Sequence, residues 1–453
     1  MTRRYDAIVA GGGPAGSTAA LRLARSGLSV LLAERTRFPR FHVGESLLPR
    51  NFQLFRELGL EAGIAALPHH RKVGGEFAFG HETASLRFRF ADGLLGDVEA
   101  ETINVERAPF DAWLLDEAVA AGAEVAQGTA VKEILQLDAG GAAVRLDTGD
   151  EVEAPVLLDA SGQSTLVGKH LGTRQGHPDH RKVAFFGHAR GVQRLPGEEA
   201  GHPCIVMMAD AWFWLIALDE ERTSVGLVMD ADHARRTGRE LGIPPQRMLA
   251  WGIARCPFVA GRTAGATLPA ENHVGADFSY HCRPYAGPGY FLLGDAATFL
   301  DPIFSTGICL AMVGASRAAD DVLALRAGAD PAAVHRRYAR FVDGSSDVFF
   351  RLVRRYYQQP FRELMMQGEG PLAIHRAIYS VLAGHVFPRP PLGLRWRVRL
   401  MEALTEVQRR VPLVPRRELH SLHPPHADAA GPAGDLPPRE AADAAGTTPR
   451  ATR

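Results

Sequence analysis

A glycine-rich turn near the N-terminus has the residue types and spacing needed to hold a pyrophosphate. Residues 11–16 read Gly-Gly-Gly-Pro-Ala-Gly, which fits G-x-G-x-x-G, and Glu34 ends the next expected strand. Glycines let the backbone approach phosphates, a helix N-terminus favours their charge, and an acid can bind a ribose hydroxyl. This pattern predicts a dinucleotide site; the alternative is a tight turn in another α/β protein. The predicted contacts are Gly11, Gly13, Pro14, Ala15, Gly16, Glu34 and Arg35.

Two later segments end expected strands with small residues. Residues 158–162 read Leu-Asp-Ala-Ser-Gly, and residues 293–297 read Leu-Gly-Asp-Ala-Ala and precede Asp301-Pro302. Both segments resemble motifs of FAD monooxygenases of the hydroxybenzoate-hydroxylase type, and Arg107 matches that family's arginine near the flavin. The resemblance implies FAD as the cofactor, with Asp295 at its ribityl chain. It adds Arg107, Asp159, Asp295 and Pro302 to the expected FAD contacts.

The segment 41–49, Phe-His-Val-Gly-Glu-Ser-Leu-Leu-Pro, narrows the family further. It resembles a loop shared by flavin-dependent halogenases and geranylgeranyl reductases, and it does not separate the two. Ser46 is the expected cofactor contact in this loop. The alternative is a polar turn between a strand and a helix.

Trp212 and Trp214 lie in a Trp-Phe-Trp-Leu-Ile-Ala segment that resembles the W-x-W-x-I-P signature of flavin-dependent halogenases. Side chains at positions i and i+2 of a strand project to the same face. Two indoles on one face form a rigid wall that would keep an organic substrate away from the flavin, which blocks direct oxygen transfer. The sixth position is Ala217 where the family has proline, and the alternative is a pair of core tryptophans.

Lys72 falls where the halogenase family carries its essential lysine, between the 41–49 segment and the first strand of the substrate domain. An ammonium there would donate a hydrogen bond to hypochlorous acid and make its chlorine more electrophilic. Desolvation would instead lower the lysine pKa and produce a neutral amine that forms a chloramine. The alternative is a solvated surface lysine.

Ser305, Thr306 and Gly307 match the halide loop of the same family, and Gly307 is also an expected FAD contact. Backbone N–H groups at a helix start suit an anion, although the segment is equally explained as a helix cap. Tryptophan halogenases have a glutamate before this loop, and here the residue is Phe304, which argues against free tryptophan as substrate. One relative attaches its flavin covalently through an aspartate in a segment similar to 276–280, so Asp277 is a candidate attachment site; otherwise it caps a turn.

The elements that must position these residues begin with a β-α-β unit: strands at 5–10 and 28–34 around a helix at about 14–26. This unit predicts an α/β fold with a doubly wound parallel sheet. Alternating strands between 183 and 229 predict an inserted antiparallel-sheet domain. The expected parts are an FAD-binding domain (1–75, 100–165 and 275–330), a substrate domain (76–99 and 166–274), a helical C-terminal region (331–422) and a disordered tail (423–453).

The composition argues against several classes of protein. Lys plus Arg and Asp plus Glu both total 51, so the charge balance does not suggest nucleic acid or an acidic membrane as partner. The four cysteines, Cys204, Cys256, Cys282 and Cys309, form no C-x-x-C, so neither a disulfide framework nor a metal site is expected. The longest apolar stretch is interrupted by aspartates, and a cytoplasmic protein is expected.

The motifs together are most similar to halogenases of the chloramphenicol and carrier-tethered pyrrole or tyrosine type. The expected enzyme uses reduced FAD, oxygen and chloride or bromide to make hypohalous acid for an electron-rich substrate in secondary metabolism. No second dinucleotide motif is found, so a separate flavin reductase is the expected source of reduced FAD. The arginines between 349 and 417 either dock an acidic carrier protein or cover the core with their stems. A geranylgeranyl-reductase-like or a hydroxylase-type FAD oxidoreductase is the alternative.

Overall fold

A mostly parallel sheet, with the strand order β20-β21-β12-β2-β3-β8, carries the glycine-rich turn. Its adjacent strands β2 (Ala7–Ala10), β12 (Leu157–Asp159) and β21 (Tyr290–Leu292) pair in parallel and are buried throughout. The strands β3 (Val30–Glu34) and β8 (Glu124–Gln127) extend it in parallel, and β20 (Ala286–Gly287) is antiparallel. Continuous apolar runs are expected for strands that are covered on both faces. The carboxyl ends of β2, β12 and β21 therefore lie side by side.

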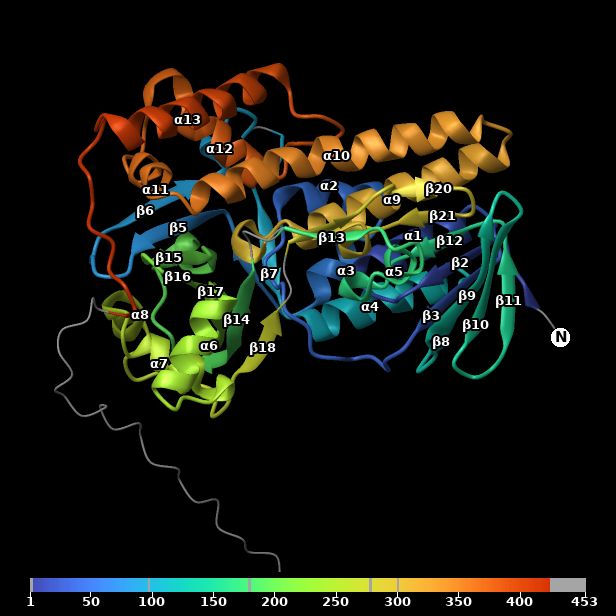
Figure 1. The fold of residues 1–453 in the computed structure, drawn as a ribbon, viewed down its shortest axis with the longest axis horizontal. Helices are drawn as coiled ribbons and strands as arrows, with labels where there is room; N and C mark the ends of the chain where they lie inside the picture. The colour runs from blue at the N-terminus through green and yellow to red at the C-terminus, as the bar shows by residue number, and fades with distance from the viewer. Residues whose placement is uncertain (1–2, 97, 178–180, 277–278, 300, 424–453) are drawn as a thin grey trace, which may run out of the picture. The chain divides into compact units, whose positions relative to one another are not determined.

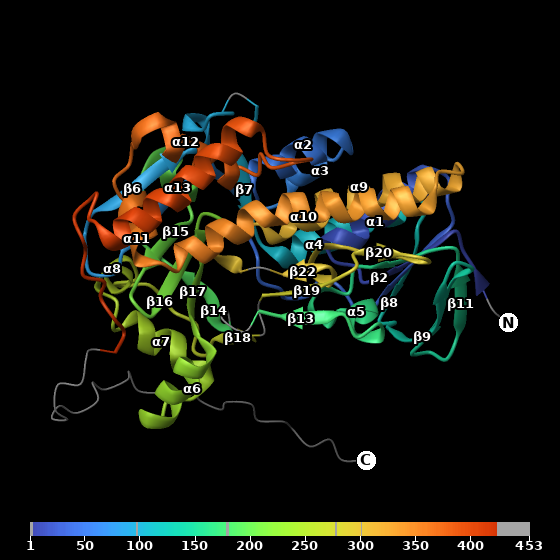
Figure 2. The same cartoon turned by 45° about the horizontal axis from the view of Figure 1, so that its top comes forward.

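Helix α1 (Pro14–Arg25) follows β2 and packs between α4 (Arg107–Ala120) and α9 (Gly307–Arg326). Alanines at 19 and 20 and a glycine at 16 are buried in α1, and such small side chains allow neighbouring elements to approach closely. The long helix α10 (Pro331–Tyr356) packs on α9 and runs from the parallel sheet towards the antiparallel sheet (Figures 1 and 2).

The antiparallel sheet has the strand order β18-β14-β17-β16-β15-β5-β6, with β15 and β5 as its parallel pair. Its strands are β5 (Gly74–Phe79), β6 (Ser85–Arg89), β14 (Lys182–Arg190), β15 (Cys204–Met207), β16 (Ala211–Ala217), β17 (Arg222–Asp230) and β18 (His273–Ala276). The helices α11 (Gln359–Met365), α12 (Ile374–Leu382) and α13 (Leu392–Arg410) gather at its β5–β6 end (Figures 1 and 2).

Three smaller sheets and several short helices complete the described chain. The sheets are β1-β11-β10-β9 (Arg3–Arg4, Glu151–Ala154, Gly141–Leu146 and Val131–Asp138), β13-β19-β22 (Arg174–Gly176, Tyr280–Cys282 and Thr298–Phe299) and β4-β7 (His69–Lys72 and Thr102–Val105). The helices are α2 (Pro49–Glu57), α3 (Glu61–Ala66), α5 (Leu166–His170), α6 (Ala231–Glu240), α7 (Met248–Ile253) and α8 (Pro257–Arg262).

The computed structural model describes residues 3–96, 98–177, 181–276, 279–299 and 301–423. The predicted combination of a parallel sheet, an antiparallel sheet and C-terminal helices is confirmed. Residues 1–422 group into one unit, so the finer division into domains stays a prediction. The predicted disordered tail, 423–453, lies outside the described residues except for His423. Among the described helices, none combines the length and apolarity needed to cross a membrane.

Candidate active site

The glycine-rich turn is closed so tightly that its glycines are required. Gly11 has a φ of 108°, and a Cβ there would lie 2.4 Å from the carbonyl oxygen of Ala160. A Cβ on Gly16 would lie 1.9 Å from the carbonyl oxygen of Gly11. A Cβ on Gly13, in contrast, would meet Arg40 Nη2 at 3.6 Å. Helix α1 begins at Pro14 and Ala15, and its N-terminus therefore faces the Arg40 guanidinium. The backbone N–H groups of the helix start and this guanidinium together form a set of donors that fits a pyrophosphate.

Glu34 closes the turn from the end of β3. Its carboxylate accepts hydrogen bonds from the backbone N–H of Gly12 (2.7 Å) and of Thr36 (2.8 Å), and also from the Thr36 hydroxyl. Oε1 accepts both bonds from Thr36, while Oε2 accepts only the Gly12 N–H and keeps a second lone pair, so the predicted bond to a ribose hydroxyl is compatible with these contacts. Arg35 is exposed beside it and donates to the Ser164 hydroxyl at 3.1 Å.

Asp159 ends β12, and its buried carboxylate binds backbone groups of the loop that follows. It accepts hydrogen bonds from the backbone N–H groups of Ser161 (3.0 Å) and Val167 (2.8 Å), and its burial raises its pKa. Asp159 therefore shapes the loop whose Ala160 carbonyl touches Gly11. The resemblance predicted an FAD contact here, and the hydrogen bonds indicate that any such contact acts through the loop.

Asp295 is brought to the same edge of the sheet by a glycine. Gly294 has a φ of 53°, and a Cβ on it would lie 2.8 Å from the Ala311 Cβ on α9 and 3.6 Å from the Ala15 Cβ on α1. Within the described chain, the Asp295 carboxylate makes no hydrogen bond. Burial raises its pKa to about 6, although the positive charge of Arg107 acts to lower it. An acceptor that is not otherwise used fits the hydroxyls of a ribityl chain.

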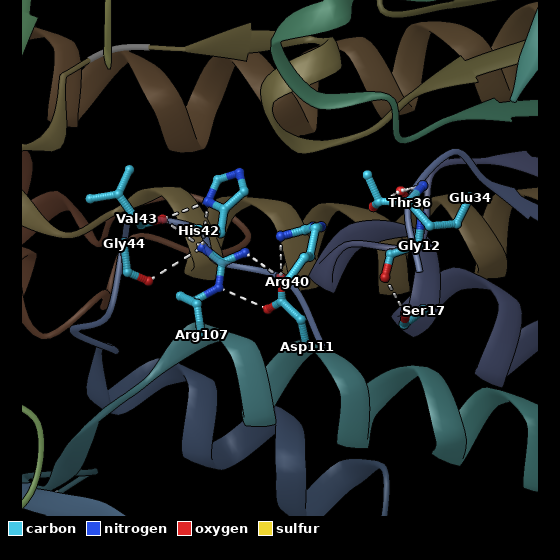
Figure 3. A network of polar contacts seen from close by, with 10 residues as sticks. All are labelled: Gly12, Ser17, Glu34, Thr36, Arg40, His42, Val43, Gly44, Arg107 and Asp111. Atoms are coloured by element: carbon cyan, nitrogen blue, oxygen red, sulfur yellow. Dashed lines mark hydrogen bonds and ion pairs between the residues drawn. The ribbon is translucent and has the colours of Figure 1, made fainter. Parts of the chain in front are cut away.

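Arg107, at the start of α4, lies in a buried charged cluster (Figure 3). Its guanidinium donates to both carboxylate oxygens of Asp111, at 2.8 and 2.9 Å, and to the carbonyl oxygen of Val43 at 2.8 Å. Arg40 forms an ion pair with the same Asp111 at 3.2 Å. Arg107 thereby holds the 41–49 loop against α4, and Arg40 is turned towards the glycine-rich turn.

Lys72 and Ser46 come together because both of their segments bond to β7. Lys72 pairs with Thr102 through the β4–β7 register, while Ser46 bridges to Asn104 on the same strand. The Lys72 ammonium donates to the Ser46 hydroxyl at 2.9 Å and to the Leu47 carbonyl oxygen at 2.8 Å. Sequence positions 26 residues apart thus form one polar site.

The Lys72 side chain is 4% exposed, so the alternative of a solvated surface lysine is wrong. Its Nζ lies 5.3 Å from the centre of the Phe90 ring. Burial lowers its pKa to about 7, since desolvation disfavours the charged form. At neutral pH the amine is therefore divided between its ammonium and neutral forms, and both predicted modes of action remain open.

Trp212 and Trp214 stand on the same face of β16, with ring centres 5.8 Å apart and planes inclined at 49°. Both are nearly completely buried. Trp214 lies opposite Gly226 on β17, where a Cβ would fall 2.2 Å from the indole, and its Nε1 donates to the Ser224 hydroxyl at 3.1 Å. The glycine makes room for the indole. The predicted placement of the two indoles on one face is confirmed, and their role as a barrier stays a prediction.

Trp212 is tied to the segment before the halide loop through a tyrosine that the sequence analysis missed. The indole Nε1 donates to the Tyr357 hydroxyl at 2.9 Å, and that hydroxyl donates to the Asp301 carboxylate at 2.8 Å. Asp301 caps the short 3₁₀ turn at Pro302–Phe304 by accepting from the Ile303 N–H. Burial raises the pKa of Asp301 to about 6. Two consecutive hydrogen bonds therefore connect Trp212 with the turn that precedes the predicted halide residues.

The predicted halide residues form the turn that starts α9. Ser305 is left-handed with a φ of 56°, Thr306 is the N-cap, and Gly307 is the first helical residue. The first N–H groups of a helix lack intrahelical acceptors and favour an anion. Phe304 packs edge-on to the Tyr356 ring at 5.8 Å, so an apolar side chain occupies the position where tryptophan halogenases have a carboxylate. The candidate attachment residue Asp277 lies outside the described residues.

Other polar residues of the site were also missed. They are Arg40, Asp111, Glu45, His188 and Tyr357. The Glu45 carboxylate lies 2.5 Å from His188 Nε2 in a partly buried contact between residues 143 positions apart. Two of them carried a local signal: Glu45 lies within the 41–49 motif, and Asp111 stands at i+4 from Arg107 on a helix.

Comparison with known proteins places this geometry in a family. Residues 4–341 match the FAD binding domain family. Over 365 residues, 79% of this chain and 87% of the relative, the chain is 32% identical to 1H-pyrrole-2-carbonyl-(peptidyl-carrier protein) brominase of Pseudoalteromonas luteoviolacea. The chain belongs to the flavin-dependent halogenases. The halogenase is also 30% identical to the corresponding chlorinase of Pseudomonas fluorescens, over 70% of this chain and 76% of that one.

The halogenase also matches solved structures over most of its length. Its fold superimposes on the flavin-dependent brominase Bmp2 with a TM-score of 0.79 at 29% identity, covering 90% of this chain and all of that one. The halogenase CmlS gives a TM-score of 0.71 at 30% identity, with 88% of this chain and 68% of that one covered. The predicted use of FAD and a halide is thereby confirmed, and the reductase and hydroxylase alternatives gain no support.

Proposed function

We propose that this halogenase makes hypohalous acid at its flavin and uses it beside Lys72, on an electron-rich substrate tethered to a carrier protein. The observation that carries the proposal is that Lys72 is buried and, among the described residues, has no carboxylate partner. Relatives that act on pyrrole held by a peptidyl carrier protein support the tethered substrate. A separate flavin reductase supplies the reduced FAD in this proposal.

The residues proposed to hold FAD surround one edge of the parallel sheet. The N-terminus of α1 and Arg40 would take the pyrophosphate, Glu34 a ribose hydroxyl, and Asp295 the ribityl chain. When bound, FAD supplies the reduction of oxygen that converts chloride or bromide into an electrophilic halogen. The other proposed contacts are Gly11, Gly13, Pro14, Ala15, Gly16, Arg35, Ser46, Arg107, Asp159, Asp277, Pro302 and Gly307.

The halide is proposed to bind at the start of α9. The N–H groups of Thr306 and Gly307 would donate to it, and Ser305, whose own N–H donates to the Pro302 carbonyl oxygen at 3.2 Å, would shape the turn around it. The positive end of this 20-residue helix favours the anion. Trp212 and Trp214 separate the organic substrate from this loop, so the oxidant rather than the substrate moves between the two places.

The reaction at Lys72 substitutes a halogen for a proton on carbon. The ammonium form donates a hydrogen bond to the oxygen of hypohalous acid, which weakens the oxygen–halogen bond. The substrate carbon then bonds to the halogen, hydroxide leaves, and the carbon's proton combines with it to give water. The Ser46 hydroxyl and the Leu47 carbonyl hold the amine in place for this step.

The test replaces Lys72 with methionine, which keeps the length of the side chain and removes the amine. We expect halogenated product, measured by mass spectrometry, to fall about a hundredfold or more, as for loss of a positioned acid. FAD affinity and oxygen consumption should remain, and a hypohalous acid trap in the buffer should still be halogenated.

The matched control is Lys169→Met, which removes an exposed amine on α5 and should leave product formation unchanged. Retained halogenation in Lys72→Met would refute the role of Lys72. Activity on free phenols and pyrroles, with none on the same groups linked to a carrier protein, would refute the tethered substrate.

A further inference from the structure

The C-terminal helices expose an unusual apolar face. Leu392 and Trp396 on α13 are 76% and 41% exposed, and Leu372, in the 3₁₀ turn Pro371–Ala373, is 62% exposed. The opposite side of α13 is buried, so the helix is well packed and these side chains are not needed for its attachment. Grouped exposed apolar side chains mark interaction sites in folded proteins.

This face is also basic. Arg395 and Arg399 are exposed, and their positions, three and seven residues after Leu392, put them on the same side of α13 as Leu392 and Trp396. Within the part of the chain that the structure describes, neither arginine pairs with a carboxylate. Near the end of the helix, Arg409 does pair with Glu406, at 3.3 Å. The start of α13 therefore carries uncompensated positive charge beside apolar side chains.

The face is held in a defined shape. Arg397 donates to the Leu372 carbonyl oxygen at 2.7 Å and to the Gly393 carbonyl oxygen at 2.9 Å, and its guanidinium stacks 4.2 Å from the centre of the Trp396 ring. Leu372 has a left-handed φ of 57°, which is unfavourable for a bulky residue. The hydrogen bond from Arg397 maintains this conformation and keeps the leucine pointing to solvent. We call Leu372, Leu392, Arg395, Trp396 and Arg399 the α13 face.

The helix that carries the α13 face is connected to the surroundings of Lys72 through α12. Helix α12 packs against α13, and its Tyr379 ring stacks on Phe88 with centres 4.7 Å apart. Phe88 contacts Phe90 at 5.8 Å, and Phe90 lies 5.3 Å from Lys72 Nζ. In both ribbon views α12 and α13 cover the β5–β6 end of the antiparallel sheet (Figures 1 and 2). Between the α13 face and the Lys72 amine lie α13 itself, α12 and the rings of Tyr379, Phe88 and Phe90, so the face and the amine are connected through one packed part of the chain.

We propose that the α13 face binds an acidic carrier domain that presents the substrate to Lys72 on a thioester-linked arm. This inference rests on the tethered substrate of the proposed function and adds the place where the carrier docks. Arginines without carboxylate partners favour an acidic protein surface, and the apolar side chains supply the dry centre that a protein interface needs. In a symmetric contact with a second copy of the chain, Arg395 and Arg399 would face the same arginines, so the charge of the face favours an acidic partner over a second copy.

The test reverses two charges, in the variant Arg395→Glu/Arg399→Glu. The probes are a peptidyl carrier protein loaded with 1H-pyrrole-2-carbonyl or a phenol acid, and the same acyl groups on a short pantetheine thioester. We expect kcat/KM for the loaded carrier to fall by about ten- to a hundredfold, with a weaker dependence on salt. The short thioesters should be halogenated within about twofold of wild type, because the chemistry at Lys72 is intact.

The matched control is Arg236→Glu/Arg239→Glu on α6, which makes the same change of charge at exposed arginines away from the α13 face. It should keep full activity on the loaded carrier. Unchanged thermal unfolding in both variants establishes that they fold.

Three outcomes would overturn the inference. The first is full activity of Arg395→Glu/Arg399→Glu on a loaded carrier, which would refute docking at the α13 face but not the proposal of a tethered substrate. The second is a failure of the wild-type protein to bind any of the loaded carriers, which would also refute the proposal of a tethered substrate. The third is binding to anionic lipid vesicles, or self-association, that the double variant abolishes while carrier activity persists.

Discussion

Replacing Lys72 with methionine should make the protein more stable at neutral pH while it loses halogenation. Burial moves the lysine pKa from 10.5 to about 7, which corresponds to about 5 kcal/mol of stability lost when the folded protein must hold the ammonium. The substitution also leaves the Ser46 hydroxyl and the Leu47 carbonyl without this donor, at a cost of about 1–3 kcal/mol. The net gain expected at pH 7 is therefore about 2–4 kcal/mol.

The difference in unfolding free energy between the wild type and Lys72→Met should depend on pH. Between pH 7 and pH 10.5 the unfolded chain keeps a proton on the lysine that the folded protein has lost. The stability of the wild type therefore rises with pH across this window. The advantage of Lys72→Met should shrink as the pH rises and reverse between about pH 8 and pH 10, where the remaining desolvation cost falls below that of the lost hydrogen bonds. Urea unfolding at several pH values and a fixed FAD concentration measures the difference.

Lys169→Met is the control, because this lysine is exposed and its loss should change stability by little at any pH. A variant at position 72 that is less stable than wild type at pH 7 would refute the reasoning. A difference in stability that does not change between pH 7 and pH 10 would refute it equally, since desolvation of the amine would then not be its cause.

Two further substitutions probe the cofactor turn and the wall. Gly16→Ala places a Cβ 1.9 Å from a backbone oxygen of the same turn, so FAD affinity, followed by flavin fluorescence, should fall at least about tenfold. Tyr357→Phe leaves the Trp212 N–H and the Asp301 carboxylate without their shared partner and should lower the unfolding free energy by about 2–4 kcal/mol. It should also raise the fraction of oxygen consumed without product, whereas Tyr338→Phe, which removes another buried hydroxyl bonded to a carbonyl at 2.7 Å, should reduce stability alone.

Several predicted elements agree with the structure because their signals are local. The helix expected at about 14–26 is observed at Pro14–Arg25, and the strands expected between 183 and 229 are observed as β14, β15, β16 and β17. Strand starts were less accurate: the first buried strand was expected at residue 5 and begins at Ala7. Apolar runs predict that a strand exists, but its first residue depends on where its neighbour can pair.

The sequence by itself determined the glycine turn, the paired tryptophans and the identity of the amine. The turn and the tryptophan pair depend on backbone freedom and side-chain alternation within a few residues, and Lys72 was identified by its position between motifs that resemble those of a family. The tertiary structure alone decided that Lys72 is desolvated, that Trp212 bonds through Tyr357 to Asp301, and that Arg40 faces the turn. A pKa and a hydrogen-bond partner depend on which distant segments exclude water from a group, and spacing along the chain does not contain that information.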